Sequence, residues 1–500
     1  MSKSPQTISI HILDDDSLLN IFHLYFFLGE DEHGLDHLEG GWYQWHQARW
    51  WYKLVHVCQR WRNLIFGSAS YLGLTLVCTN GTLVANMLAH SPPLPLTVDY
   101  SDEDGITAED EDAIMLALEQ RDRVRHLRLF FPFWKLRNFV MAIDGEFPIL
   151  QYLIVISQME GSSALMLRET LQAPHLKHLM LTGFTHPIGP RLHPTAVGLV
   201  TLDLLIHQPS AYFQPNILLQ WISFMPQLEK LVISFVFPGH NRDAEMQFTR
   251  TPITTPITLP NLRWFWFYGI SEYLEAIVCR ISTPRLEKLQ IQFFEQLTFS
   301  VPRLVQFMNT TGNLRFDSAE LEFSDNRGRV ETYLRETNAY AFAIKVYCWH
   351  LDWQVSSVAQ ILSELGKVFS LVEHLSLELK VHEEHNEVDR IEWHILLRSF
   401  SNVKTLHVED GLVEKLARCL RLESEDRPLE LLPELQVLTY SGSRDAGNAF
   451  TPFINSRQNA GRPVTLVHPH QSEATSSLVS SFGAPVISSL SGKAGYGIEG

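Results

Sequence analysis

A short apolar pattern recurs along most of this chain and limits what the chain can fold into. The pattern is an apolar residue, two variable residues, a second apolar residue, one variable residue and a third apolar residue. Its clearest copy runs from Leu286 through Leu289 to Ile291. Alternating apolar positions predict a short strand that buries one face. Because a strand this short cannot make a core alone, the copies must share one.

The copies and their spacing indicate how the strands are joined. They are found at Val124/Leu127/Leu129, Leu150/Leu153/Val155, Leu176/Leu179/Leu181, Leu199/Leu202/Leu204, Leu228/Leu231/Ile233, Leu262/Phe265/Phe267, Leu286/Leu289/Ile291, Ile344/Val346, Leu375/Leu377, Val403/Leu406/Val408 and Leu435/Leu438/Tyr440, with a degenerate copy at Leu321/Phe323. Proline stands two residues before the first apolar position at Pro174, Pro226, Pro260, Pro284 and Pro433. Between Val124 and Leu286, successive copies begin 23 to 34 residues apart. A strand and its connection of about 20–29 residues are typical of a leucine-rich-repeat solenoid.

The spacing therefore predicts an α/β fold, an irregular leucine-rich-repeat solenoid with parallel strands inside and helices outside. Residues 216–225, 272–281 and 352–365 have the helical spacing expected of the outer layer. The polar and charged segment 324–338 is expected to be an insertion on one rim or a loop. A parallel α/β sheet without repeat symmetry is the alternative that the sequence leaves open.

Length and composition limit the class of protein further. The 500 residues exceed what one compact core usually supports, whereas a repeat array grows along one dimension. The formal net charge of −16 argues against a nucleic-acid partner, since phosphate binding needs clustered lysine and arginine. The cysteines are isolated, the first residues lack the apolar core of a signal peptide, and no long apolar run follows. We expect a soluble chain of the cytoplasm or nucleus that binds no membrane.

Motifs that carry chemistry are missing from the sequence. It contains no phosphate-cradling glycine loop, nucleophile elbow or metalloprotease helix. His382 and His385 are one residue short of the two-histidine metal spacing, and their charged surroundings predict a solvated segment. We expect no catalytic residue, no cofactor and no metal, and therefore a chain that is not an enzyme.

The N-terminal residues predict helices separated by a loop. Asp14 precedes an apolar run and can cap the first turn of a helix. Residues 29–41 are acidic and contain glycine, as is typical of an exposed loop. Residues 42–66 resume helical spacing, and residues 73–122 predict a strand, a helix and a strand that connect to a further helix.

Two stretches of this region resemble a known module. The first is Leu-Asp-Asp-Asp-Ser-Leu-Leu-Asn-Ile-Phe at residues 13–22. The second is Trp-Tyr-Lys-Leu-Val-His-Val-Cys-Gln-Arg-Trp-Arg-Asn-Leu-Ile at residues 51–65, followed by Ser-Tyr-Leu at residues 70–72. Together they resemble an F-box, in the form found in the F-box proteins that are numerous in mushroom-forming fungi. Asp14 stands in place of the family's proline, and residues 29–41 separate the helices more widely than the family pattern does.

The resemblance implies a set of partner contacts. An F-box packs against the Skp-type linker of a ubiquitin ligase and through it reaches a cullin. The residues that the resemblance assigns to this contact are Leu13, Leu18, Ile21, Phe22, Val57, Trp61 and Leu64. The alternative is that these apolar side chains form the private core of a small helical domain.

The repeat geometry suggests a second surface. If the apolar positions of each strand face the core, the residues between them point to the opposite face. In one repeat these are Trp264, Trp266 and Tyr268, and in earlier repeats they include Phe130 and Tyr152. An exposed aromatic row is typical of a protein-binding hot spot. The alternatives are that another segment covers the row or that the two faces are inverted there.

These interpretations give a four-part organisation. Residues 1–72 are expected to form an F-box-like helical domain, 73–122 a connection and N-terminal cap, 123–467 the solenoid, and 468–500 a disordered tail. The implied function is a substrate-recognition adaptor of an SCF-type (Skp-cullin-F-box) ubiquitin ligase, whose repeats bind an unidentified target protein. The alternative is a repeat scaffold or inhibitor that recruits no ligase.

Overall fold

The computed structural model describes most of the chain. It describes residues 13–28, 49–103, 105–143, 145–158, 165, 171–184, 196–208, 211–236, 256–294, 299–337, 339–380, 390–426, 431–441 and 447–468. The predicted loop at 29–41, the segment from His382 to His385 and the predicted tail after residue 468 lie outside the described residues.

Two compact units make up the described chain. The first contains the residues up to Asp99 together with Ala108–Ala117. The second contains Tyr100–Thr107 and the residues from Leu118 onward.

The first unit is mainly helical. Its elements are α1 (Asp15–Leu28), α2 (Trp51–Leu54), α3 (Gln59–Gly67), β1 (Leu76–Cys78), α4 (Val84–His90), most of β2 (Leu96–Ser101) and most of α5 (Ala108–Glu119). Helix α1 begins as the sequence predicts, because the Asp14 carboxylate accepts a hydrogen bond of 2.7 Å from the Ser17 backbone N–H. Arg60 of α3 also stabilises this turn, since one Nη donates hydrogen bonds of 2.7 Å to the Asp15 carboxylate and to the Leu13 carbonyl.

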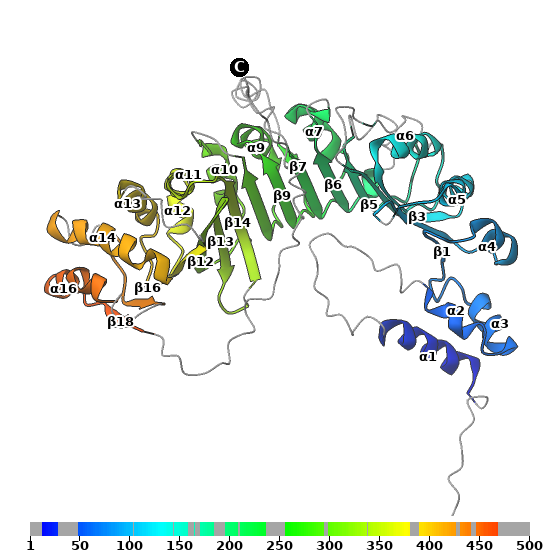
Figure 1. The fold of residues 1–500 in the computed structure, drawn as a ribbon, viewed down its shortest axis with the longest axis horizontal. Helices are drawn as coiled ribbons and strands as arrows, with labels where there is room; N and C mark the ends of the chain where they lie inside the picture. The colour runs from blue at the N-terminus through cyan, green and yellow to red at the C-terminus, as the bar shows by residue number, and fades with distance from the viewer. Residues whose placement is uncertain are drawn as a thin grey trace, which may run out of the picture. The chain divides into compact units, whose positions relative to one another are not determined.

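The second unit is built on one long sheet (Figure 1). Its strands are β3 (Val124–Pro132), β4 (Tyr152–Gln158), β5 (His178–Thr182), β6 (Thr201–Ile206), β7 (Lys230–Phe235), β9 (Trp264–Gly269), β11 (Lys288–Phe293), β12 (Ser318–Ser324), β13 (Arg327–Leu334), β14 (Ala339–Tyr347), β15 (His374–Lys380), β16 (Thr405–Val408), β17 (Val437–Tyr440) and β18 (Thr465–Val467). From β3 to β11 and from β15 to β18, neighbouring strands are parallel and follow chain order, leaving out the short β8 and β10.

The strand register aligns the apolar positions of the repeat. Leu127 pairs with Leu153, which pairs in turn with Leu179, and the alignment continues strand by strand to Leu289. These side chains are at most 1% exposed, as a shared core requires. The predicted repeat and its strands are thus confirmed over this part of the unit.

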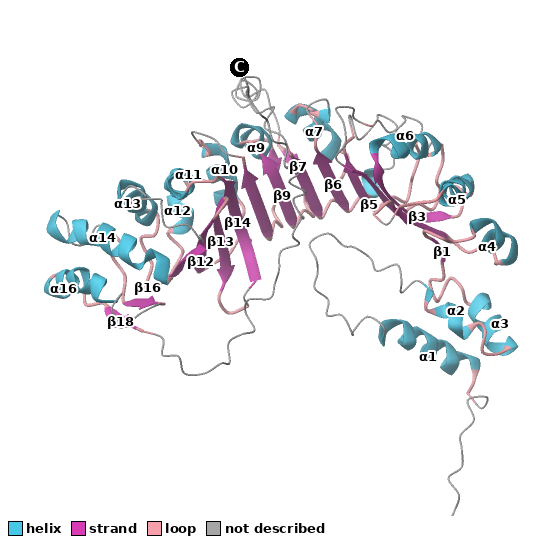
Figure 2. Cartoon of the chain, in the orientation of Figure 1, coloured by secondary structure: helices cyan, strands magenta, loops and turns pink. Residues whose placement is uncertain are grey.

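Helices cover one face of this sheet (Figure 2). They are α6 (Phe133–Ala142), α7 (Pro215–Ile222), α9 (Ser271–Val278), α10 (Pro302–Thr310), α11 (Leu351–Glu364), α12 (Gly366–Phe369), α13 (Arg390–Arg398), α14 (Asp410–Asp426) and α16 (Thr451–Asn459), with 3-10 turns η4 (Ala196–Gly198) and η6 (Asn448–Phe450). The predicted helical segments correspond to α7, α9 and α11. The second predicted segment ends at Ile281, three residues after α9 ends. Ile281 instead belongs to a two-stranded sheet of β10 (Ile281–Ser282) and β8 (Ile257–Thr258).

The expectation of an all-parallel sheet is wrong over residues 318–347. Strand β13 lies between β12 and β14 and is antiparallel to both, so the segment predicted as a rim insertion or loop is a strand inside the sheet. Its alternation places Gly328, Val330 and Thr332 on the buried face. The charged residues Arg327, Arg329 and Glu331 lie on the opposite face. Gly328 lets helix α11 approach, because a Cβ there would lie 3.2 Å from the Val358 side chain and 3.3 Å from Gln354.

Around the inserted strand, the observed register differs from the prediction for two copies of the repeat. Leu289 and Ile291 pair with Phe342 and Ile344, two residues before the predicted Ile344/Val346. Strand β12 is shifted in the same way, since Ala319 and Leu321 align with Leu375 and Leu377 in place of the predicted Leu321/Phe323. A shift of two residues keeps the same side chains in the core, so the apolar pattern alone could not distinguish the registers.

A buried carboxylate joins two helices of the outer layer. The Glu275 carboxylate of α9 accepts hydrogen bonds of 2.8 Å from the backbone N–H groups of Arg303 and Leu304, in the first turn of α10. These donors have no partner within their own helix. The pKa of Glu275 is raised to about 7. Burial is the main cause and the nearby Glu364 carboxylate adds to it, while the two backbone hydrogen bonds oppose the rise.

Candidate interaction surface on the open face of the sheet

The open face is defined here as the face of the second-unit sheet that points away from the helices. Strand β9 shows the alternation that produces it: Phe265 and Phe267 are fully buried, whereas Trp264, Trp266 and Tyr268 are half-buried on the other side. The structure therefore places the predicted aromatic row on the open face.

Two lysines flank the first tryptophan of this row. The register sets Lys230 of β7 and Lys288 of β11 directly beside Trp264 on neighbouring strands. The Lys230 ammonium lies 4.1 Å from the centre of the Trp264 ring and the Lys288 ammonium 5.6 Å from it. Both distances are in the range of cation–π attraction, which orients the ammonium groups over the indole. The name aromatic strip is used below for Lys230, Trp264, Trp266, Tyr268 and Lys288.

The indole N–H groups of the strip lack hydrogen-bond acceptors within the described structure. The Nε1 atoms of Trp264 and Trp266 are buried, and neither donates a hydrogen bond within the described structure. A buried polar group without a partner costs about 1–3 kcal/mol. Tyr268 lies beside Phe294 and Tyr347, with ring centres 4.7 and 6.1 Å away, and burial raises the pKa of its hydroxyl to about 12.

A second aromatic group lies on the open face of β3 to β5. The Tyr152 ring stacks on His178 with centres 4.2 Å apart, and His126 meets its edge at 4.8 Å. Burial lowers the pKa of His126 to about 3 and that of His178 to about 4, so both imidazoles are neutral at pH 7. Phe130 is half-buried at the far end of β3. The register keeps Phe130 and Tyr152 apart from the Trp264 row, with β5, β6 and β7 between β4 and β9.

One acidic group lies on the open face between these aromatic groups. Asp203 of β6 pairs across the strands with Met180 and Val232. Burial raises its pKa to about 6, and the positive charge of Lys230 opposes the rise. The composition and the apolar pattern gave no sign of this carboxyl group.

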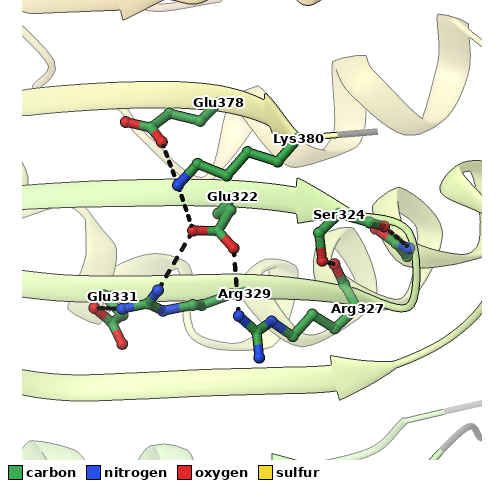
Figure 3. Close-up of polar contacts among 8 residues, drawn as sticks. Glu322, Ser324, Arg327, Arg329, Glu331, Glu378 and Lys380 are labelled. Carbon is green, nitrogen blue, oxygen red and sulfur yellow. Dashed lines mark hydrogen bonds and ion pairs between the residues drawn. The ribbon is translucent and has the colours of Figure 1, made fainter. Parts of the chain in front are cut away.

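The open face changes character at β12, β13 and β15 (Figure 3). Glu322, which is 4% exposed, lies 2.9 Å from the Lys380 ammonium, 3.4 Å from the Arg329 guanidinium and 3.6 Å from that of Arg327. Lys380 also bonds to Glu378 at 3.0 Å, and Arg329 contacts Glu331. Burial alone would raise the pKa of Glu322, but these cations outweigh it and lower the pKa. We call these residues, with Glu320, the charge network.

Part of the charge network also has the composition of a metal site. Carboxylate oxygens of Glu320, Glu322 and Glu378 lie within 4.8 Å of one another. The Lys380 ammonium, however, bonds to two of these three carboxylates. The group is therefore explained by its own ion pairs, and we assign no metal to it.

In the first unit, some of the residues that the F-box resemblance assigns to a linker are buried and others are exposed. Leu18 and Phe22 are 0% and 1% exposed, and Phe22 packs edge-on against Trp61 with ring centres 4.9 Å apart. These side chains thus contribute to the unit's own core. Ile21 and Val57 are 42% and 58% exposed. Leu13, Trp61 and Leu64 are half-buried.

Three exposed apolar residues of this unit were not predicted as contacts. Leu24 and Tyr25 continue the helical spacing from Ile21, and they are 58% and 48% exposed. Tyr71 is 58% exposed and stacks on His23 of α1, with ring centres 5.7 Å apart. Extending the helical spacing of Ile21 by three and four residues would have found the first two.

The comparisons with known proteins add little to this description. No protein-family model matches the chain, and no curated protein matches it. The crystal structure of the leucine-rich-repeat-containing protein LegL7 from Legionella pneumophila is 12% identical, covers 78% of this chain and 99% of its own, and has a TM-score of 0.27. Among the described helices, none combines the length and the apolar character needed to cross a membrane. The repeat assignment therefore rests on the register and burial of the chain's own strands.

Proposed function

We propose that this protein is the substrate-recognition adaptor of an SCF-type ubiquitin ligase. The first unit docks a Skp-type linker, which connects it to a cullin, and the open face of the second unit binds the target protein. The chain performs no chemistry itself. It raises the effective concentration of the target near the enzyme that transfers ubiquitin.

The observation that carries the proposal is the exposed apolar stripe on helix α1. Ile21, Leu24 and Tyr25 share one side of the helix at the spacing of three and four residues. Val57 and Tyr71 add further exposed apolar area in the same unit. An apolar stripe left open by a small helical unit is typical of a surface that a partner helix covers. The F-box resemblance supports a Skp-type linker as that partner.

Co-purification with a Skp-type linker tests the proposal. The informative variant is Ile21→Asp with Val57→Asp, because both side chains are exposed and the substitutions leave the core intact. Phe22 is unsuitable, since it is fully buried and its loss would unfold the unit. A matched control replaces Val197 and Leu371, which are 51% and 58% exposed in the second unit, with aspartate.

The proposal predicts that wild type and the control retain the linker and that the α1 variant loses it. Circular dichroism of all three proteins checks that folding is equal. A folded wild type that binds no linker would contradict the adaptor function.

A second function is a repeat scaffold that recruits no ligase. It is favoured by the burial of Leu18 and Phe22, because two of the residues assigned to the linker then serve the unit's own core. Under this function the open face still binds a partner protein, and the linker experiment separates the two.

A further inference from the structure

The charge of the aromatic strip differs from that of the whole chain. The formal net charge of the protein is −16, yet the two ionisable side chains beside Trp264 are both lysines. On the open face of the neighbouring strand β6, the acidic residue is Asp203, which aligns with Val232, two residues along from Lys230. The strip is thus a local cationic area on an acidic protein, and it favours an anionic ligand.

The hydrogen-bonding groups of the strip are mainly donors. The two lysine side chains have only donors. The indole N–H groups are buried and out of a ligand's reach, so they take no part in the contact. The neighbouring acceptor, Oε1 of Gln290, already accepts a hydrogen bond of 2.9 Å from the Tyr340 hydroxyl. A ligand that complements these groups must therefore bring acceptors.

The spacing of the lysines fits a small anionic group. Lys230 and Lys288 lie on the strands either side of β9, so their backbones are about 9–10 Å apart across two strand spacings. The Lys230 ammonium lies over the Trp264 ring, and the Lys288 ammonium lies 5.6 Å from that ring and 5.3 Å from the Tyr340 ring. Flexible lysine stems allow both ammonium groups to reach one carboxylate or two adjacent ones. The indole rings and Tyr268 then offer apolar surface to the neighbouring side chains of the ligand.

We propose that the aromatic strip binds an acidic peptide segment of the target protein, with aspartate or glutamate carboxylates held between Lys230 and Lys288. The proposal rests on the proposed function for its use of the open face as the target surface, and it adds the chemical class of the target. A nucleic acid is a poorer fit, because a polyanion needs an extended basic surface and the overall charge of −16 repels it.

Selection from a random peptide library tests this proposal without knowledge of the target. The full chain is immobilised and the frequency of Asp and Glu in retained peptides is compared with the input library. The strip variant is Lys230→Met with Lys288→Met. The control is Lys367→Met with Lys404→Met, which removes the same charge away from the strip. A third protein, Lys230→Arg with Lys288→Arg, keeps the charge.

Wild type, the control and the arginine protein are expected to enrich acidic peptides, and the strip variant is expected to lose the enrichment. One retained peptide should bind the strip variant at least about tenfold more weakly than wild type. Asp203→Asn should strengthen its binding, because a like charge is removed. Each of these results supports the proposal.

Four outcomes would overturn it: no enrichment of Asp or Glu, equal enrichment by wild type and the strip variant, retention only of peptides from a parallel phosphoserine library, or preference for a single-stranded RNA. The linker experiment is independent of this one. If the protein binds no linker but retains acidic peptides, the strip is the binding surface of a scaffold. If it binds the linker but retains no acidic peptides, the adaptor function holds and the target binds elsewhere.

Discussion

The aromatic strip and the charge network lie on the same face of one sheet but differ in the signs of the charges that they hold. In the charge network, Glu322 pairs with Lys380, Arg329 and Arg327, so a carboxylate and cations from neighbouring strands meet inside the protein. In the strip, the charged side chains beside Trp264 on the neighbouring strands are the two lysines Lys230 and Lys288. The network thus holds both signs of charge within the protein, whereas the strip concentrates positive charge and favours a ligand that brings carboxylates.

The difference follows from topology. Strand β13 is the antiparallel insertion, and its register sets Arg329 opposite Glu322 and Glu331 opposite Glu320. In the parallel repeats around β9, the chain offers only lysines beside Trp264. The inserted strand thus brings an arginine next to a carboxylate of β12, an arrangement that depends on the antiparallel pairing.

The largest expected effect contrasts the two sides of strand β9. Phe265→Ala should lower the free energy of unfolding by about 3–5 kcal/mol, because the ring is fully buried in the core. Trp264→Ala should lower it by only about 1–2 kcal/mol, since the indole is half-buried. Urea unfolding followed by circular dichroism measures both. Equal losses would contradict the assignment of Trp264 to the open face.

The charge network should be sensitive to the loss of its central carboxylate. Glu322→Ala should destabilise the region by about 3 kcal/mol, because the cations around it lose their shared partner in a buried setting. Hydrogen exchange of the β12 and β13 amides reports this locally. Lys230→Met in the strip is the comparison and should leave amide protection nearly unchanged. Equal effects from both variants would remove the distinction between the regions.

The close packing of β13 against α11 gives a smaller effect. Gly328→Ala should cost about 1–3 kcal/mol, because the added methyl group would press on Val358 and Gln354. Gly312→Ala is a suitable control, since a Cβ there meets nothing within 4 Å. If the two variants melt at the same temperature, the inserted strand is not packed as described.

The smallest effect concerns pH. The folded pKa of His178, about 4, lies below the ordinary 6.5, so the unfolded chain takes up a proton that the folded chain does not as pH falls from 6.5 toward 4. Stability that is present above pH 6.5 is therefore lost in this range. The lowered pKa of Glu322 has its effect only below its ordinary value of 4.5.

Comparing wild type with His178→Gln isolates the histidine, because Asp203 and Glu275 titrate in both proteins. Between pH 7 and pH 5, the melting temperature of wild type should fall further than that of the variant. A parallel loss in the two proteins would show that His178 protonates as freely when folded as when unfolded.

The apolar pattern predicted most of the solenoid because its residues are the core. Leu153, Leu179 and Leu202 are at most 1% exposed, so their spacing carries the register from strand to strand. Strand β13 was not predicted, since its charged residues are accommodated in the sheet only beside Glu320 and Glu322 of another strand. Such pairing depends on tertiary contacts that no local pattern encodes.

The candidate sites were predictable to different degrees. Alternation alone placed Trp264 and Trp266 on the open face. The same alternation puts Lys230 and Lys288 on this face, but their position beside Trp264 depends on the register between repeats. On α1, the sequence predicted a helix with an apolar run, but the packing of Phe22 against Trp61 decided which residues are buried and which stay exposed.

Hydrogen exchange of the full chain with and without a retained acidic peptide tests the contrast between the two regions most directly. The account predicts slower exchange at β7, β9 and β11, with β12, β13 and β15 unchanged. Slower exchange at the charge network with none at the strip would contradict it, because the self-paired region would then be the binding surface.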